Sequence, residues 1–409
     1  MRTEPRWSEL ETIVVVRMAT SDDRVDGVLP ARVVAPESTE QVSAVLAWAN
    51  ERDVRIVARG GGSKLGWCNP ARSVDLILSL EKFRRVVEHA WQDMTVTVET
   101  GTTIASLQSE LAKQRHRLPL DALWPERSTV GGVIAANDSG ALRLRYGSIR
   151  DLILGVTVVL ANGTIARSGG RVVKNVAGYD LPKLFAGSFG TLGIITEVTL
   201  RTYPLPHSVR TISIPFTDLA DANRYMLAIA DTSLVPTGMQ LRVSSGQSPM
   251  VDVRFEGLEE GITAQVQKAT MLASSGKVIA ASEDVWSKRE ELWNADESAM
   301  VGKFSVLPSR TADCINVIAS HCDPIDSIAQ SLGLGICRIK IKDSKALLAL
   351  RAAIHQLGGS FTVLHAPLEI RRGVDSFGDT GSAHPLMIRI KQRFDPRGIL
   401  SPGRFVGGI

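Results

Sequence analysis

Apolar residues recur at helical spacing and in short strand-like runs along the first part of the chain. Ser38 to Gln41 form a capping box ahead of apolar positions that share one helical face, which predicts a helix ending near Asn50. The apolar run 54–58 predicts a buried strand that leads into the glycine-rich sequence 59–66. Further elements are predicted at 75–80 (strand), 95–99 (strand) and after Thr103 (helix). This alternation predicts a mixed α and β fold.

Small residues and turn signals dominate the region that follows. Between residues 128 and 140, glycine, alanine and serine stand where a packed helix needs bulk, so another group is expected close to this backbone. Asn162 and Gly163 predict a two-residue hairpin turn, and the apolar run 194–201 predicts a strand.

The pair Pro204 and Pro206 marks the best internal boundary, because the composition changes after it. Glycine becomes rarer, and strand and helix candidates alternate in a second α+β domain. The strand candidates are 211–215, 239–243, 250–255, 336–341 and 361–364, and the helix candidates are 219–230, 263–273 and 346–357. A last helix is expected at 385–394, stopped by Asp395-Pro396. The expected parts are 1–206, 207–380 and a tail, 381–409.

Composition narrows the possible classes of protein. Of the 409 residues, 44% are hydrophobic and 22% charged, which suits a large folded core and excludes a disordered or collagen-like chain. The net charge of +4 is too small and too dispersed for nucleic-acid binding. The start of the chain lacks a secretion signal, and the longest apolar stretch is about half of the ~20 residues that cross a bilayer. We expect a cytoplasmic protein, with any association with the inner membrane face peripheral and through partners.

The four cysteines, Cys68, Cys314, Cys322 and Cys337, form no C-x-x-C pair and no two ligand pairs at metal-site spacing. The sequence therefore predicts neither an iron–sulfur cluster nor a zinc site on this chain. Small thiols in a reducing compartment are the expected alternative.

The glycine-rich loop after the first strand has the composition of a phosphate site, since only glycine lets backbone N–H groups approach a phosphate closely. Gly61 to Gly66 has the frame of a P-loop, but Trp67 and Cys68 replace its lysine and hydroxyl, which excludes an NTPase. Leu65 stands where a nicotinamide Rossmann fingerprint needs its third glycine, which excludes that domain. Taken alone, such a loop is more often structural than functional.

Three motifs together give a family resemblance. The loop R-G-G-G-S at 59–63, the segment S-T-V-G-G at 128–132 and the strand G-T-L-G-I at 190–194 resemble the vanillyl-alcohol-oxidase or PCMH-type FAD-binding domain. The resemblance implies an α+β fold with a two-subdomain FAD-binding part, an antiparallel cap domain, and a tail that returns to the FAD part. By analogy, the FAD-binding residues are Arg59, Gly60, Gly61, Gly62, Ser63, Gly66, Ser128, Thr129, Gly131, Gly132, Asn137, Gly140, Gly193, Ile194 and Ile195.

The mode of FAD attachment follows from one departure from this family. Members that attach FAD covalently near the first loop carry histidine at the position of Ser63. A serine cannot form that linkage, and no cysteine lies between Cys68 and Cys314 to form another. The sequence predicts non-covalent FAD.

A closer resemblance comes from V-V-K-N-V-A-G-Y-D-L at 172–181 and G-S-F-G at 187–190. These motifs are similar to the glycolate oxidase and D-2-hydroxyacid dehydrogenase branch, and within it to the smaller FAD-binding subunits of bacterial three-subunit glycolate oxidases. The resemblance implies oxidation of a small 2-hydroxy acid, glycolate to glyoxylate. It also implies two partners, a larger FAD-binding glycolate oxidase subunit and an iron–sulfur subunit that receives electrons.

The catalytic residues are less clear in the sequence. Catalytic members of the branch carry a histidine-rich G-D-G-N segment, and Gly378-Asp379-Thr380-Gly381 lacks its asparagine and histidine. The remaining candidates are His365, as base, and Arg371, for the substrate carboxylate. Each is also a common packing residue. The open alternatives are a self-sufficient dehydrogenase of another hydroxy acid or sugar, and a structural subunit with a degenerate flavin site.

Overall fold

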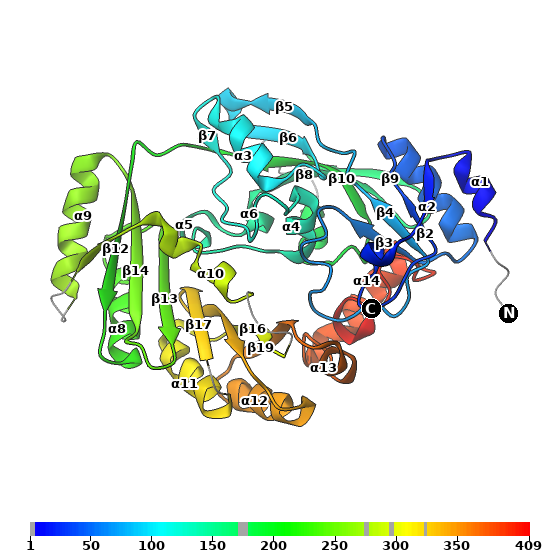
Figure 1. The fold of residues 1–409 in the computed structure, drawn as a ribbon. Coiled ribbons are helices and arrows are strands. Elements are labelled where there is room, and N and C mark those ends of the chain that lie inside the picture. The colour runs from blue at the N-terminus through cyan, green and yellow to red at the C-terminus, as the bar shows by residue number, and fades with distance from the viewer. Residues whose placement is uncertain (1–4, 171–178, 274–277, 294–297, 323–324) are drawn as a thin grey trace. The chain divides into compact units, whose positions relative to one another are not determined.

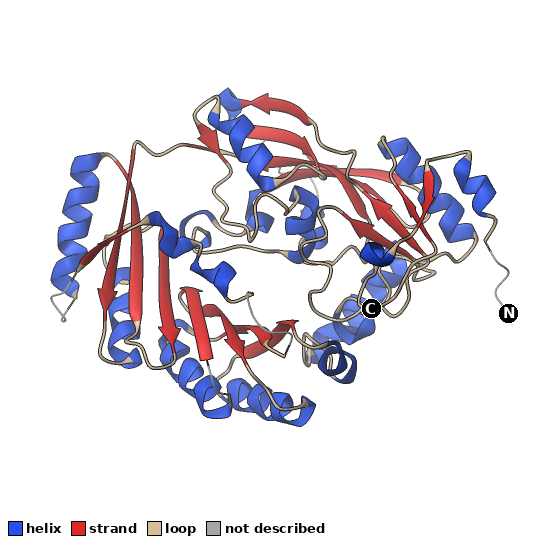
Figure 2. Cartoon of the chain, in the orientation of Figure 1, coloured by secondary structure: helices blue, strands red, loops and turns tan. Residues whose placement is uncertain are grey.

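The computed structural model describes residues 5–170, 179–273, 278–293, 298–322 and 325–409 (Figure 1). The chain forms two compact units by its contacts. The first unit comprises 1–138, 148–205 and 379–409, and the second comprises 139–147 and 206–378. Each unit combines helices with sheets, as Figure 2 shows, and the α+β prediction is confirmed.

The first unit opens with a four-stranded sheet in the order β1-β2-β4-β3. β2 and β3 both run parallel to β4, while β1 pairs antiparallel with β2. Helix α2 packs on this sheet, and Ser38 caps it by accepting a hydrogen bond from the Gln41 N–H, as predicted. The elements are α1 (Trp7–Glu11), β1 (Val16–Met18), η1 (Ser21–Asp23), β2 (Arg32–Val34), α2 (Thr39–Glu51), β3 (Ile56–Arg59) and β4 (Leu76–Ser79).

A five-stranded antiparallel sheet, β5-β6-β10-β8-β9, forms the rest of this unit's framework. Helices α3 and α4 bury their apolar faces against it. β8 and β9 pair across Asn162-Gly163, so the hairpin prediction is confirmed. The elements are β5 (Val86–Ala90), η2 (Trp91–Asp93), β6 (Thr95–Glu99), α3 (Ile104–Ala112), β7 (His116–Arg117), α4 (Val130–Ala136), α6 (Ile149–Leu152), β8 (Ile153–Val159), β9 (Ile165–Gly169), α7 (Pro182–Phe185), β10 (Ile194–Arg201) and β11 (Tyr203–Pro204).

The C-terminal tail is part of the first unit. Leu400 forms a parallel bridge with Ile56 at the start of β3, and the ring of Phe394 lies 5.9 Å from that of Phe185. These contacts bring the end of the chain beside its first sheet. The tail elements are η5 (Gly381–Ala383), α14 (His384–Phe394) and η6 (Val406–Gly408).

The second unit is built on an eight-stranded antiparallel sheet, β15-β12-β14-β13-β17-β18-β16-β19. Helices α8, α9, α11 and α12 share one apolar core with a face of this sheet (Figure 1). The elements are α5 (Arg143–Tyr146), β12 (Ser208–Pro215), α8 (Leu219–Ala230), β13 (Gly238–Ser244), β14 (Met250–Gly257), α9 (Glu259–Leu272), β15 (Ile279–Ala281), η3 (Glu283–Trp286), α10 (Lys288–Glu291), β16 (Met300–Ser305), η4 (Pro308–Arg310), α11 (Thr311–His321), β17 (Ile325–Ser331), β18 (Leu334–Ile339), α12 (Ser344–Gln356), β19 (Ser360–His365) and α13 (Leu368–Gly373).

The segment 139–147 differs from the expected division, which placed it with the first part. Its side chains and backbone are bound by the second unit's sheet and the residues around it. The Tyr146 hydroxyl donates to the Glu256 carboxylate at 2.9 Å, and Arg289 donates to the Ser139 carbonyl at 2.8 Å. These long-range bonds, which the local sequence does not reveal, assign the segment to the second unit.

Candidate functional site

A groove in the first unit gathers the glycine-rich motifs. About 810 Å³ of space lies between its walls, including the open solvent at its mouth. Its walls come from the end of β3, from α4 and from the start of β10. The lining residues are Val57, Ala58, Gly60, Gly61, Gly62, Ser63, Lys64, Leu65, Leu80, Thr100, Thr129, Gly131, Gly132, Ala135, Ala136, Ser188, Phe189, Gly190, Gly193, Ile194, Ile195 and Arg404.

The first wall is the loop that follows β3, and its glycines are required by close contact with the second wall. A Cβ on Gly60 would lie 2.1 Å from the Thr129 hydroxyl, and one on Gly61 would lie 1.7 Å from the Arg127 carbonyl oxygen. Gly62 adopts a φ of +72°, which side chains seldom tolerate. A larger residue at Gly60 or Gly61 would push the loop away from the second wall, whereas one at Gly62 would strain the backbone.

The second wall is the N-terminal turn of α4. Thr129 caps this helix through its hydroxyl, which accepts from the Gly132 N–H at 3.3 Å. A Cβ on Gly131 would lie 2.8 Å from the side chain of Thr100, which follows β6. The small residues of this segment were predicted to accommodate a close neighbour. One such neighbour is the protein itself, through Thr100.

The third wall is the turn before β10. A Cβ on Gly193 would lie 2.6 Å from Val158 of β8, so this glycine lets the turn reach the sheet. Phe189 has a φ of +52°, and its N–H donates to the Ala135 carbonyl at 2.9 Å. The turn and α4 are thereby joined along the groove.

Ten of the predicted FAD-binding residues line the groove. They are Gly60, Gly61, Gly62, Ser63, Thr129, Gly131, Gly132, Gly193, Ile194 and Ile195. Five others lie off its surface: Arg59, Gly66, Ser128, Asn137 and Gly140. The structure explains why three of these five residues do not line the groove. Ser128 is buried behind the wall, Gly140 belongs to the second unit, and the Arg59 side chain is bound elsewhere.

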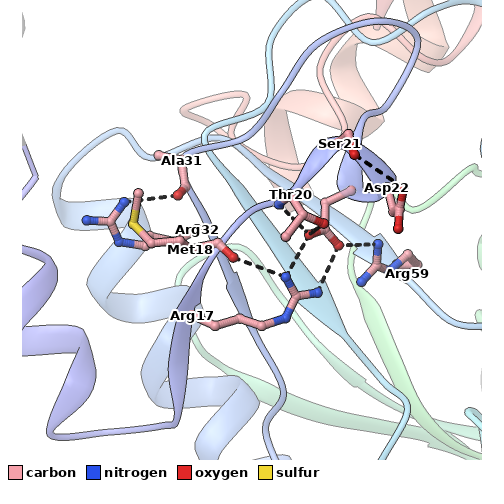
Figure 3. Close-up of polar contacts among 9 residues, drawn as sticks. Arg17, Met18, Thr20, Ser21, Asp22, Ala31, Arg32 and Arg59 are labelled. Atoms are coloured by element: carbon pink, nitrogen blue, oxygen red, sulfur yellow. Dashed lines mark hydrogen bonds and ion pairs between the residues drawn. The ribbon is translucent and has the colours of Figure 1, made fainter.

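Arg59 is held by Asp23 rather than by the groove. The Asp23 carboxylate, which is buried, accepts from Arg59 at 2.8 Å and from both terminal nitrogens of Arg17 at 2.6 and 2.8 Å (Figure 3). The Arg17 hydrogen bonds are the largest cause that lowers the pKa of Asp23 far below its usual range. The side chain of Arg59 therefore anchors the base of the loop.

Several lining residues were missed by the sequence reasoning. Ser188, Phe189 and Gly190 lie in the glycine-rich turn before Gly193, so proximity in the sequence was the available signal. Arg404 comes from the S-P-G-R motif of the tail. It is buried, lies 3.3 Å from Asp26, and donates to the Leu65 carbonyl at 2.5 Å. Only the return of the tail brings it to the loop.

The residues present fit a dinucleotide with a diphosphate. Within the described chain, the backbone N–H groups of Gly61, Gly62 and Ser63 have no protein acceptor, so consecutive donors remain for an anion at the groove. The buried Oδ1 of Asn137, at the C-terminal end of α4, likewise has no partner among the described residues. Leu65, Ile194 and other apolar side chains supply contact surface between these polar positions.

Comparison with known proteins agrees with this geometry. Residues 30–169 match a family model described as an FAD binding domain. The fold is similar to p-cresol methylhydroxylase, with a TM-score of 0.73 and 17% identity over 98% of this chain and 93% of that one. The chain is an FAD-dependent oxidoreductase, and residues 30–169 form its FAD binding domain. FAD is therefore the cofactor of the first unit, and the predicted PCMH-type fold is confirmed.

Two curated relatives are similar over much of the chain. The glycolate oxidase subunit GlcD of Bacillus subtilis is 27% identical over 92% of this chain and 89% of its own length. The mitochondrial cytochrome-type D-lactate dehydrogenase of Arabidopsis thaliana is 30% identical over 74% of this chain, but this region spans only 55% of the plant protein.

The predicted catalytic residues lie in the second unit. His365 ends β19 half-buried, with its ring 6.3 Å from the ring of Trp293. Arg371 is buried, and its Nε donates to the Ala366 carbonyl at 3.0 Å. This hydrogen bond fixes the turn before α13. At least the Nε of Arg371 is therefore occupied by a protein acceptor.

The seven-residue spacing of Trp286 and Trp293 predicts one helix with a solvated Arg289 between them, but the structure of this region differs. The structure has η3 ending at Trp286 and a separate α10 of four residues. Arg289 is 2% exposed, because it donates to the Ser139 carbonyl. The seven-residue spacing was thus not helical periodicity.

A second hollow, of about 670 Å³, lies in the second unit beside β13, β17 and β18. Its cations are paired. Arg242 lies 2.6 Å from Asp252, Lys288 lies 2.8 Å from Glu291, and Arg338 forms an ion pair with Asp326. The hydrogen bond that Arg242 donates to the Asp252 carboxylate raises the pKa of Arg242. The positive charge in this hollow is therefore already balanced by carboxylates.

The motif at 172–181 lies mostly outside the described residues, and Tyr179 at its end is 91% exposed. The four cysteines are buried and form no disulfide with each other. Burial raises the pKa of Cys314 to about 12 and that of Cys322 to about 11. In the described parts of the chain, no three His, Cys, Asp or Glu residues are grouped to hold a metal ion, and no helix is long and apolar enough to span a membrane.

Proposed function

We propose that this chain is the FAD-binding subunit of a glycolate oxidase-like complex, which oxidises a 2-hydroxy acid such as glycolate and passes electrons to an iron–sulfur partner. The observation that carries the proposal is the similarity to the Bacillus subtilis glycolate oxidase subunit over 92% of this chain and 89% of that protein. An alignment of that extent includes both units, so the likeness extends beyond the FAD-binding part.

Oxidation of a 2-hydroxy acid removes two electrons and two protons, and the product is a 2-oxo acid. When bound, FAD supplies the two-electron acceptor that amino-acid side chains lack. The chain supplies the groove that orients the cofactor through the loop 60–63 and α4. It must also hold the substrate carboxylate and accept the hydroxyl proton.

The second unit offers limited means for those last two tasks. His365, half-buried at the end of β19, is the proposed base, because imidazole is the side chain that most often transfers protons in enzymes. Arg371, whose Nε donates to the Ala366 carbonyl, is the proposed carboxylate ligand because a guanidinium group binds carboxylates through paired N–H donors. The balanced charges of the second hollow provide no surplus cation for a carboxylate. This supports an electron-relaying subunit that depends on a catalytic partner.

The proposed iron–sulfur centre is assigned to another subunit. Thiolate is the form that ligates iron, and burial keeps the thiols of Cys314 and Cys322 protonated. The other two cysteines, Cys68 in the first unit and Cys337 in the second, are also buried. We propose that electrons from FAD leave through a cluster that a partner subunit supplies.

The test compares the isolated chain with the complex reconstituted from the neighbouring subunits, using glycolate and an artificial electron acceptor. The proposal expects slow or no turnover by the isolated chain and rapid turnover by the complex. It also expects Gly61→Val, which removes FAD from this chain, to impair the complex. Rapid turnover by the isolated chain, lost in His365→Ala, contradicts the relay. Full complex activity with FAD-free Gly61→Val favours a structural subunit.

A self-sufficient dehydrogenase is the second candidate. The similarity to the Arabidopsis thaliana D-lactate dehydrogenase, 30% identical over 74% of this chain, favours it. The discriminating measurement is anaerobic bleaching of the isolated yellow protein by glycolate, D-lactate and larger D-2-hydroxy acids. Stoichiometric bleaching by one acid, followed by turnover without partners, would establish this candidate.

A further inference from the structure

Lys64 is buried inside the glycine-rich loop, with its side chain only 5% exposed. Lysine is seldom buried without a partner, because its ammonium group is strongly hydrated in water. This lysine directly follows Ser63 and lines the groove. Its Nζ, however, is bonded to protein groups behind the wall.

The Lys64 ammonium joins the first wall to the second. Its Nζ donates to the Ser128 hydroxyl at 2.6 Å and lies 3.4 Å from the carboxylate of Asp138, which follows α4. The Ser128 hydroxyl in turn lies 3.0 Å from that of Ser63 and donates to the Leu123 carbonyl at 2.6 Å. One ammonium group thus connects the residues just before and just after α4 to the loop.

Two tryptophans surround the same ammonium. Nζ lies 5.6 Å from the ring centre of Trp67 and 5.5 Å from that of Trp124, within the range of cation–π attraction. Asp138 is 4% exposed, so water has little access to the pair. Solvent therefore screens the attraction between the two charges little, and removing either one would leave the other buried without its partner.

The distance between the two walls decides whether the backbone N–H groups of the loop 61–63 face an anionic ligand. Gly60 and Gly61 already lie against Thr129 and Arg127 with no room for a side chain. Contact of this kind prevents the walls from moving closer but does not stop them from separating. The bonds of Lys64 resist separation, because they connect the two sides with charge.

We propose that Lys64 is a positioning residue that clasps the loop 60–63 to the α4 segment and thereby sets the affinity for FAD. The clasp acts on the backbone N–H groups of Gly61 to Ser63, which it holds in the orientation that a diphosphate needs. This role of Lys64 concerns FAD binding alone and does not depend on which substrate the enzyme oxidises.

The experiment measures the Kd of FAD for the apoprotein of the full chain, by the change of flavin fluorescence on binding. Lys64→Met keeps the bulk and removes the charge, and it is expected to weaken binding by about tenfold or more. The matched control is Lys113→Met, which removes an exposed lysine at the end of α3 and is expected to leave the Kd unchanged.

A double variant separates positioning from simple charge balance. Lys64→Met with Asp138→Asn leaves no unpaired buried charge, so its apoprotein is expected to unfold at a higher temperature than Lys64→Met alone. Its FAD affinity is expected to stay low, with an altered visible circular dichroism of the bound flavin. Wild-type affinity and dichroism in the double variant, or wild-type affinity in Lys64→Met, would overturn the proposal.

Ser128→Ala keeps the proposal testable where the charge variants fail to fold. It removes the hydroxyl that Lys64 binds without disturbing either charge, and Ser128 is not on the groove surface. A loss of about fivefold in FAD affinity is expected from one such hydrogen bond. An unchanged Kd for a folded Ser128→Ala would contradict the clasp.

Discussion

The ammonium group of Lys391 donates a hydrogen bond to the carbonyl oxygen of Thr191 at 2.8 Å, across 200 positions of sequence. The same Nζ donates to Asp395 at 2.6 Å and to the Leu400 carbonyl at 2.9 Å. Lys391 therefore binds the tail to the turn that leads into β10. Through this contact the end of the chain supports the third wall of the groove.

Replacing Lys391 by methionine is expected to destabilise the first unit. The substitution leaves the Asp395 carboxylate buried without its ion-pair partner, and breaking such a pair costs about 3 kcal/mol or more. Thermal unfolding of the apoprotein measures the loss. Lys113→Met is the control, because its exposed pair with Glu110 contributes about 0.5 kcal/mol or less. Equal melting temperatures for the two variants would contradict the prediction.

Gly61→Val is expected to abolish FAD binding. A Cβ at this position would lie 1.7 Å from the Arg127 carbonyl oxygen, so the loop must move away from the second wall. Equilibrium dialysis with FAD measures the effect. Gly261→Val in α9 serves as the control, since no atom lies within 4 Å of a Cβ there. FAD binding by Gly61→Val at wild-type affinity would show that the cofactor lies elsewhere.

FAD is expected to leave the protein completely on denaturation. Ser63 stands at the position of the covalently linked histidine, and a hydroxyl forms no such bond with flavin. Acid precipitation followed by absorbance of supernatant and pellet gives the distribution. Yellow colour that stays with the pellet after washing would contradict the prediction.

The stability of the first unit is expected to fall below neutral pH because of His89. Burial, and then the neighbouring His116 at 5.6 Å between ring centres, lower the pKa of His89 from its usual 6.5. The unfolded chain therefore binds this proton more readily than the folded chain does. The stabilisation is complete above about pH 6.5 and is lost as the pH falls through the lowered pKa.

His89→Phe tests this pH dependence, because it keeps a ring at the site and removes the titrating group. Melting temperatures measured from pH 7.5 to 5 should fall less steeply for this variant than for the wild type. His355→Gln, which changes an exposed histidine of α12, is expected to follow the wild-type curve. Parallel curves for His89→Phe and the wild type would assign the acid sensitivity to other groups.

Local elements of both units could be predicted from the sequence, because their causes are local. β6 and β10 have the predicted bounds, as does α8 at 219–230. Their apolar periods and caps act over a few residues and do not depend on the rest of the chain. The three glycine motifs could be grouped only through their resemblance to a known FAD-binding family, because a glycine permits close approach without indicating which segment approaches.

The tertiary structure alone decided which side chains complete the site. Lys64 reaches Asp138, Arg404 returns with the tail to Leu65, and Arg59 turns to Asp23. The same holds for Arg289, which is buried because Ser139 lies opposite it. Such pairings join residues that are tens to hundreds of positions apart. The sequence around a charged side chain does not reveal its partner, because the free energy that buries the charge comes from groups brought together only by folding.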